Sequence, residues 1–108
     1  MFKNVNVRQA QELISRGVTV VDVRDFKEWS VGHIGGARNV TLTALRADAT
    51  AEVPRRKVLF VCARGVRSQL AARIAAEGGV TEIYSLVGGT SAWARAGLPL
   101  VHRLDVAV

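Results

Sequence analysis

The chain has 108 residues, of which 49% are hydrophobic and 22% are charged, so we expect one globular domain spanning residues 1–108 rather than a disordered polypeptide. A single cysteine excludes a disulfide framework and a cysteine-cluster metal site, and the absence of any apolar run near the ~20 residues that cross a bilayer excludes a membrane segment. The formal net charge of +6 favours anionic partners, but the basic residues are scattered and aromatic residues are few, so we expect small anions and no nucleic acid.

The N-terminal segment predicts a helix followed by a buried strand. Asn6 and Gln9 have the spacing of a capping box before an apolar stripe, and Gly17 is placed to end that helix in a left-handed conformation. Residues 18–23, VTVVDV, form a β-branched run without polar alternation, which is typical of a strand covered on both faces. Residues 1–20 contain no continuous apolar core of a signal peptide, so we expect a cytoplasmic protein.

The next stretch predicts short elements joined by turns. Asp25 and Glu28 repeat the capping-box spacing and predict a short helix over residues 26–31. A glycine-rich turn then leads to a short strand around residues 37–40, and a further short helix is expected over residues 42–47.

The second half of the chain begins with its most hydrophobic strand, KVLFVC at residues 57–62. A helix is predicted for residues 66–77, and EIYSL at residues 82–86 predicts another strand. Thr90 or Ser91 is placed to cap a last helix.

Strands that alternate with helices and are apolar throughout indicate an α/β fold. We expect a mostly parallel central sheet of about five strands with helices on both faces. The tail, residues 101–108, has no partner in this pattern. It is a last strand, a strap across the surface or the start of a longer polypeptide.

Cys62 is expected at the edge of the sheet where open parallel sheets bind ligands, outside the carboxyl ends of the strands. The loop from Cys62 to Arg67 leads into a helix, so its backbone N–H groups have no partners within that helix and form an anion site when they turn inward. Gly65 permits the tight backbone that such a loop needs. The N–H dipoles and Arg67 favour a thiolate at Cys62.

Two interpretations of Cys62 compete. Free cysteine is among the most buried residue types, so the simpler interpretation makes it a core residue. Arg64, Gly65 and Arg67 follow it closely, however, and give it electropositive rather than apolar surroundings. We therefore favour a nucleophile.

Three stretches together resemble the rhodanese-like sulfurtransferases. CARGVRS, residues 62–68, resembles the family's active-site loop, Cys-x-x-Gly-x-Arg-Ser. VVDVRDFKEWSVGHIGGARNV at residues 20–40 is similar to its upstream signature, and LVGGTSAWARAGLP at residues 86–99 is similar to its closing segment. The three motifs occur in the family's order and spacing over about residues 5–100, which makes the resemblance specific. Thr41 departs from it, because the family often has proline there.

The resemblance implies a three-layer rhodanese-like fold and a sulfurtransferase that needs no cofactor and no metal. Cys62 would take a sulfane sulfur from thiosulfate or a persulfide donor, hold it as a persulfide and pass it to cyanide or a thiol, with a sulfur-relay protein as a further partner. The inward N–H groups of residues 63–67 would stabilise the terminal sulfur. The predicted substrate-binding residues are Ala63, Arg64, Gly65, Val66 and Ser68, beside the catalytic Cys62 and Arg67.

Several polar residues have individual expected roles. Arg67 orients the loop and attracts the anionic donor, and Ser68 adds a hydroxyl hydrogen bond. Arg64 either recruits the donor or is a solvated surface arginine. Asp22 and Arg24 end their strand at the same sheet edge, and we expect a structural ion pair that supports the cysteine loop. We expect structural hydrogen bonding for the nearby histidine, His33, rather than a role as general base.

A cysteine-dependent phosphatase or arsenate reductase is the main enzymatic alternative. Phosphatases of this kind place five residues between the cysteine and the arginine, whereas this chain has four, residues 63–66. One residue fewer removes up to ~3.5 Å of chain, so the loop suits a single sulfur atom better than a phosphate group. The loop also contains no acidic residue that would protonate a leaving group.

Two further alternatives are a non-catalytic rhodanese-like binding or regulatory module and a redox sensor. Such modules commonly lack the cysteine that this chain keeps, so we rank the module below an enzyme. A redox sensor would use an oxidised Cys62, and the absence of a second cysteine to resolve it counts against that function.

Overall fold

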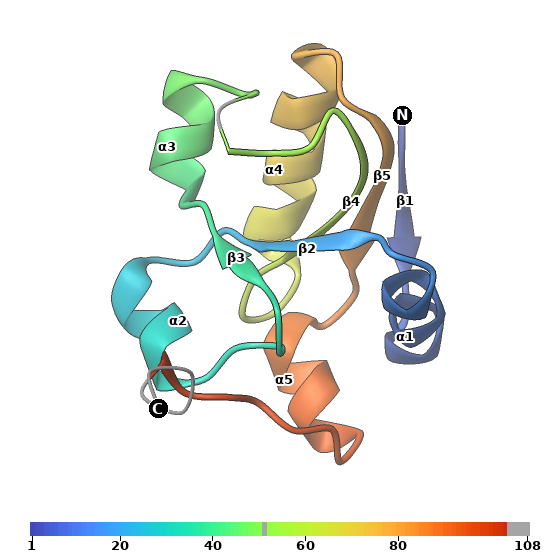
Figure 1. Ribbon diagram of the computed structural model, residues 1–108, viewed down its shortest axis with the longest axis vertical. Coiled ribbons are helices and arrows are strands. Elements are labelled where there is room, and N and C mark those ends of the chain that lie inside the picture. The colour runs from blue at the N-terminus through green and yellow to red at the C-terminus, as the bar shows by residue number, and fades with distance from the viewer. Residues whose placement is uncertain (51, 104–108) are drawn as a thin grey trace.

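The computed structural model describes residues 1–50 and 52–103 and is built around a parallel sheet of five strands in the order β1-β5-β4-β2-β3 (Figure 1). In chain order the elements are β1 (Phe2–Val5), α1 (Val7–Ser15), β2 (Thr19–Asp22), α2 (Phe26–Val31), β3 (Arg38–Asn39), α3 (Leu42–Ala47), β4 (Arg56–Val61), α4 (Val66–Glu77), β5 (Thr81–Leu86) and α5 (Gly89–Arg95). The predicted α/β fold with about five strands is confirmed. None of the helices among these described residues is long and apolar enough to cross a membrane.

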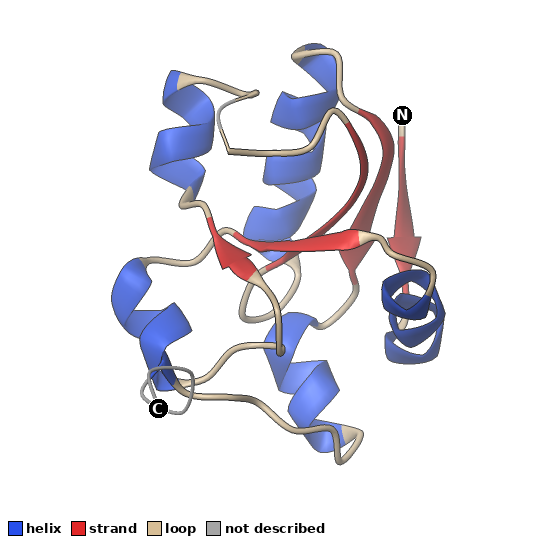
Figure 2. Cartoon of the chain, in the orientation of Figure 1, coloured by secondary structure: helices blue, strands red, loops and turns tan. Residues whose placement is uncertain are grey.

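Helices cover both faces of the sheet (Figure 2). Successive side chains of a strand point to opposite faces. In β4, accordingly, Val58 and Phe60 belong to a core cluster with the buried side chains of α3 and α4. Leu59 and Val61 belong to a second cluster, which contains Trp93 of α5 and the apolar face of α1. These four of the six β4 side chains are fully buried, which explains why this part of the strand has no polar alternation.

Both capping boxes predicted from the sequence form. Asn6 accepts a hydrogen bond from the Gln9 N–H at 2.9 Å, and the Gln9 side chain accepts one from the Asn6 N–H at 2.9 Å. Asp25 and Glu28 make the same reciprocal pair at the start of α2. Gly17 follows α1 with a φ of +91°, the left-handed conformation that was expected to end this helix.

The first strand and the start of the last helix differ from the sequence-based expectation. Strand β1 was not predicted, because it is an edge strand of four residues, of which only Val5 is buried. Helix α5 begins at Gly89 after Gly88, which has a φ of +76° and no side-chain cap, so neither Thr90 nor Ser91 is the capping residue. Both lie in the first turn, and their backbone N–H groups bond to another loop, described below.

Val101, at the start of the tail, pairs with the turn that follows α2. The N–H of His33 donates to the Val101 carbonyl at 2.9 Å, and the Val101 N–H donates back at 2.8 Å, in an antiparallel bridge. Leu98 and Leu100 pack against the core cluster of α1 and α5. The bridge at Val101 lies outside the five-stranded sheet, and residues 104–108 of the tail lie outside the described residues.

Candidate active site

Cys62 directly follows β4 and is 1% exposed. Its Sγ atom accepts hydrogen bonds from the backbone N–H of Gly65 at 3.1 Å and from that of Ser68 at 3.3 Å. Two N–H groups of the chain between Cys62 and the first turn of α4 are therefore directed at the sulfur, and of the residues 63–67 predicted as donors, Gly65 is the one that makes this hydrogen bond among the described residues. The contribution of the Ser68 N–H was not predicted, because the expected donors were those of residues 63–67.

The carbonyl groups of this loop are held in the opposite direction by the start of α5. The Cys62 carbonyl accepts from the Thr90 N–H at 2.9 Å, and the Ala63 carbonyl accepts from the Ser91 N–H at 3.1 Å. These backbone N–H groups have no partner inside α5, because they belong to its first turn. Fixing the carbonyls outward leaves the N–H side of the same loop free to face the sulfur.

Two glycines allow the loop and the start of α5 to approach this closely. A Cβ atom on Gly89 would overlap the Cys62 carbonyl oxygen and would lie 2.6 Å from the carbonyl oxygen of Ala63. Gly65 has a φ of +96°, and a Cβ atom there would lie 3.0 Å from the nitrogen of Gly88. The Gly89 position therefore excludes a side chain for steric reasons, whereas at Gly65 a Cβ atom would make an unusually tight contact, and both positions add the strain of a left-handed backbone.

A cavity of about 250 Å³ adjoins the loop and is lined by Cys62, Ala63, Arg64, Val66 and Arg67. The structure thus brings together most of the residues predicted to bind substrate. Val66 is 78% exposed, and Arg64 is also exposed, with no hydrogen bond or ion pair to any described residue. The cavity has room for a small anion, and Arg64 is the uncompensated positive charge on its wall.

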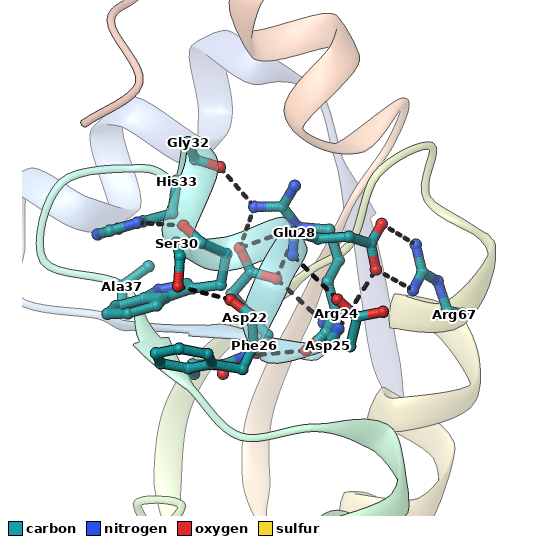
Figure 3. Close-up of polar contacts among 12 residues, drawn as sticks. Asp22, Arg24, Asp25, Phe26, Glu28, Ser30, Gly32, His33, Ala37 and Arg67 are labelled. Carbon is teal, nitrogen blue, oxygen red and sulfur yellow. Dashed lines mark hydrogen bonds and ion pairs between the residues drawn. The ribbon is translucent and has the colours of Figure 1, made fainter. Parts of the chain in front are cut away.

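Arg67 forms an ion pair with Glu28, a residue that was not predicted from the sequence to belong to the site. Its Nη1 and Nη2 atoms donate to the two carboxylate oxygens of Glu28 in α2, at 2.8 and 3.0 Å (Figure 3). The hydrogen bonds from Arg67 hold the pKa of Glu28 below its ordinary value of 4.5, and those same bonds raise the pKa of Arg67. The capping box and the family signature both include Glu28, but neither indicates its partner in α4.

Asp22 and Arg24 form a buried ion pair beneath α2. The Arg24 Nη2 atom lies 2.8 Å from an Asp22 carboxylate oxygen and also donates to the Gly32 carbonyl at 2.7 Å (Figure 3). The Asn39 amide donates to the carbonyls of both residues, at 3.2 and 2.9 Å. These hydrogen bonds connect the end of β2 to Gly32, which follows α2, and to Asn39 in β3. This agrees with the expected structural role of the pair. The link to the Cys62 segment is a backbone hydrogen bond, from the N–H of Val23 to the carbonyl of Val61 at 2.9 Å.

The side-chain partners of Ser68 and His33 show what these two residues contribute to the structure. The Ser68 hydroxyl is buried and hydrogen-bonded to the Ser85 hydroxyl at 2.8 Å, so it is its backbone N–H that reaches the sulfur. His33 is 2% exposed, stacks on Trp29 with ring centroids 4.0 Å apart, and its Nδ1 lies 2.7 Å from the Trp29 carbonyl. These contacts explain His33 as a structural residue. Across the described parts of the chain, no three His, Cys, Asp or Glu side chains gather closely enough to hold a metal ion.

The chain is similar in sequence and in structure to known proteins. A family model described as rhodanese-like domain matches residues 6–96. Thiosulfate sulfurtransferase GlpE from Ectopseudomonas mendocina (strain ymp) is 40% identical over 98 residues, which make up 91% of this chain and 89% of that protein. A rhodanese-related protein from Thermoplasma volcanium has a TM-score of 0.82 at 30% identity, over 92% of this chain and 97% of that one. A protein from Rhodopseudomonas palustris described as a possible tyrosine phosphatase has a TM-score of 0.79 at 29% identity, over 93% and 85% of the two chains.

Proposed function

The chain belongs to the rhodanese-like domain family and is a sulfurtransferase, and we propose that Cys62 carries the transferred sulfur as a persulfide, with thiosulfate as a donor. One observation carries the proposal. The Cys62 sulfur accepts hydrogen bonds from two backbone N–H groups and lines a cavity that Arg64 and Arg67 also line. Such a site combines a nucleophile with fixed donors for a developing negative charge.

The first half-reaction loads the cysteine. The Cys62 thiolate attacks the outer sulfur of thiosulfate, a new S–S bond forms, and the bond between the two thiosulfate sulfur atoms breaks. Sulfite leaves with the electron pair of the broken bond, and the enzyme retains Cys62–S–S⁻. The inward N–H groups of the loop stabilise the negative terminal sulfur, as an oxyanion hole stabilises a negative oxygen.

The second half-reaction returns the thiolate. A thiophilic acceptor, either cyanide or a thiol, attacks the terminal sulfur, and the bond to the Cys62 Sγ atom breaks with its electron pair on Sγ. Cyanide becomes thiocyanate, and a thiol becomes a persulfide. Because the donor product leaves before the acceptor reacts, ping-pong kinetics are expected. A sulfur-relay protein with an exposed thiol would enter at this same step.

The two arginines of the cavity contribute differently to donor binding. The Arg67 charge is balanced by Glu28, so this arginine mainly fixes the shape of the cavity wall. Arg64 has no carboxylate partner among the described residues and supplies the net positive charge that attracts the thiosulfate dianion. Of the two roles that the sequence left open for Arg64, we therefore propose donor recruitment.

The length and the N–H directions of the Cys62 loop count against the phosphatase alternative. The likeness to a protein described as a possible tyrosine phosphatase is a likeness in fold, and one fold serves many activities. In this chain the N–H groups of Gly65 and Ser68 both point to one atom, the Cys62 sulfur, and four residues separate Cys62 from Arg67. This arrangement supports transfer of a single sulfur atom. Non-catalytic rhodanese-like modules commonly lack this cysteine, so the presence of Cys62 supports an enzyme over such a module.

The test is sulfur loading of the purified protein. Incubation with thiosulfate is expected to add the mass of one sulfur atom to Cys62, and cyanide is expected to remove it. The Cys62→Ser variant serves as the control and should take up no sulfur. Transfer by that variant at the wild-type rate would disprove the assignment, and hydrolysis of an aryl phosphate without sulfur uptake would favour the phosphatase.

A further inference from the structure

A second hollow lies beside the Cys62 cavity. Its volume is about 370 Å³, and it is lined by Arg64, Gly88, Ser91 and Arg95. Arg64 lines this hollow and the Cys62 cavity alike, so the two spaces are neighbours that share one wall. Thiosulfate needs only the first of them. The second is within the size range of pockets that hold small organic ligands.

The hollow has an unbalanced positive charge. Arg64 and Arg95 are both exposed, and neither makes an ion pair or hydrogen bond to another described residue. By contrast, Arg24 and Arg67 are each paired with a carboxylate. Among the residues that the structure describes, no acidic side chain lines the hollow. Two free guanidinium groups at one small concavity are suited to bind carboxylates.

The hollow is held in a fixed position relative to the sulfur. Ser91, on its wall, donates its N–H to the carbonyl of Ala63 at 3.1 Å, and Ala63 is the residue after the nucleophile. Gly88, also on its wall, packs against Gly65 so closely that a Cβ atom on Gly65 would lie 3.0 Å from the Gly88 nitrogen. The backbone that forms one wall of the hollow is therefore joined directly to the Cys62 loop.

From these observations we propose that the hollow binds a carboxylate group of the thiol acceptor, so that Arg64 and Arg95 make the enzyme selective for small thiols that bear carboxylates at some distance from the sulfur. This inference rests on the proposed sulfur transfer and names the class of acceptor. The carboxylate end occupies the hollow, while the thiol reaches across Arg64 to the sulfur in the neighbouring cavity.

The step that this binding promotes is balanced. The acceptor thiol loses its proton as its sulfur attacks the terminal sulfur of Cys62–S–S⁻. An S–S bond forms to the acceptor, and the bond to Sγ breaks, with its electron pair on Sγ. The proton ends on the terminal sulfur, so the products are the acceptor persulfide and the Cys62 thiolate. No external oxidant or reductant takes part.

The test compares two acceptors that differ in their carboxylates. Glutathione, a tripeptide thiol with two carboxylates, is assayed beside its diethyl ester at equal thiolate concentration after loading the enzyme from thiosulfate. Wild-type enzyme is expected to use glutathione with a kcat/KM roughly five-fold above that for the ester, mainly through KM. In Arg95→Gln the ratio should fall to roughly two or less, and Arg95→Glu should reverse the preference.

A matched control separates local binding from net charge. Arg73→Gln removes the same unit of charge from an exposed position on α4 outside both spaces, and it should leave the ratio at the wild-type value. Equal use of acid and ester by the wild type would overturn the inference, as would an equal fall of the ratio in Arg73→Gln. Cyanide is the reference acceptor. If no sulfur reaches cyanide, the proposed function fails, whereas normal transfer to cyanide with no acid preference overturns only this inference.

Discussion

Arg67 donates to both carboxylate oxygens of Glu28, at 2.8 and 3.0 Å, although the two residues are 39 positions apart in the chain. The same carboxylate also caps α2, because its Oε1 atom accepts from the Asp25 N–H at 3.3 Å. Glu28 thus connects the cap of α2 to the first turn of α4, the helix that follows the Cys62 loop. The pair is part-exposed, with side-chain exposures of 39% for Arg67 and 33% for Glu28, so solvent weakens the attraction between the two charges.

Replacing Glu28 by glutamine is expected to impair sulfur loading without unfolding the protein. Glutamine retains one acceptor oxygen but removes the charge, so Arg67 loses its bidentate partner and its fixed position on the cavity wall. We expect kcat/KM for thiosulfate to fall roughly two- to five-fold, which matches the ~0.4–1 kcal/mol of a part-exposed ion pair. Steady-state kinetics with cyanide as acceptor measure this. Glu77→Gln, at an exposed position on the same helix as Arg67, should show no change.

The pair also predicts how stability depends on pH. The hydrogen bonds from Arg67 lower the pKa of Glu28 below 4.5, so the folded state binds the proton more weakly than the unfolded state does. The contribution of the pair is therefore fully present above pH 4.5 and is lost as the pH falls through the lowered pKa of the folded protein. Urea unfolding of wild type and Glu28→Gln across acid pH should show a difference in unfolding free energy that shrinks in this range. A difference that stays constant would contradict the assignment.

Gly89→Ala should displace the Cys62 loop. The added methyl group would overlap the Cys62 carbonyl, which must then leave its hydrogen bond with the Thr90 N–H. We expect the rate of sulfur transfer to fall roughly ten- to a hundred-fold, because small displacements of reacting groups have large effects. Gly17→Ala is the matched control, since Gly17 also has a positive φ but no atom of the described residues would lie within 4 Å of the added methyl group. It should cost about 1–2 kcal/mol of stability from backbone strain and leave sulfur transfer unchanged.

The buried and exposed ion pairs should differ sharply in their effect on stability. Asp22→Ala leaves the Arg24 guanidinium buried without its carboxylate, and we expect a loss of about 3–5 kcal/mol in unfolding free energy. Glu82→Gln breaks a pair with Arg56 whose side chains are 42% and 63% exposed, and should cost less than about 1 kcal/mol. Chemical denaturation of both variants gives the comparison. Similar losses would show that burial does not set the strength of the Asp22–Arg24 pair.

Local patterns in the sequence predicted the elements whose stabilising contacts are local. The capping boxes at Asn6 and Asp25 predicted the starts of α1 and α2, because a capping box joins residues three apart. The start of α5 could not be found in this way. Its first-turn N–H groups bond to the carbonyls of a loop more than 25 residues earlier, and a cap from Thr90 or Ser91 is not needed. Strand β1 has almost no apolar signal of its own, and pairing with β5 defines it.

Hydrophobic runs and short-range spacing were enough to predict the α/β architecture and the buried strand that leads to the Cys62 loop, although β4 ends at Val61, one residue before the predicted end. The partners that complete the site are apparent only in the folded chain. The sheet places β4 between β5 and β2, and this arrangement brings α5 against the carbonyls of the Cys62 loop and α2 against Arg67. Contacts between residues far apart in the chain depend on strand order and helix packing, which no local pattern specifies. For the same reason, the neighbouring positions of Arg64 and Arg95 are visible only in the folded protein.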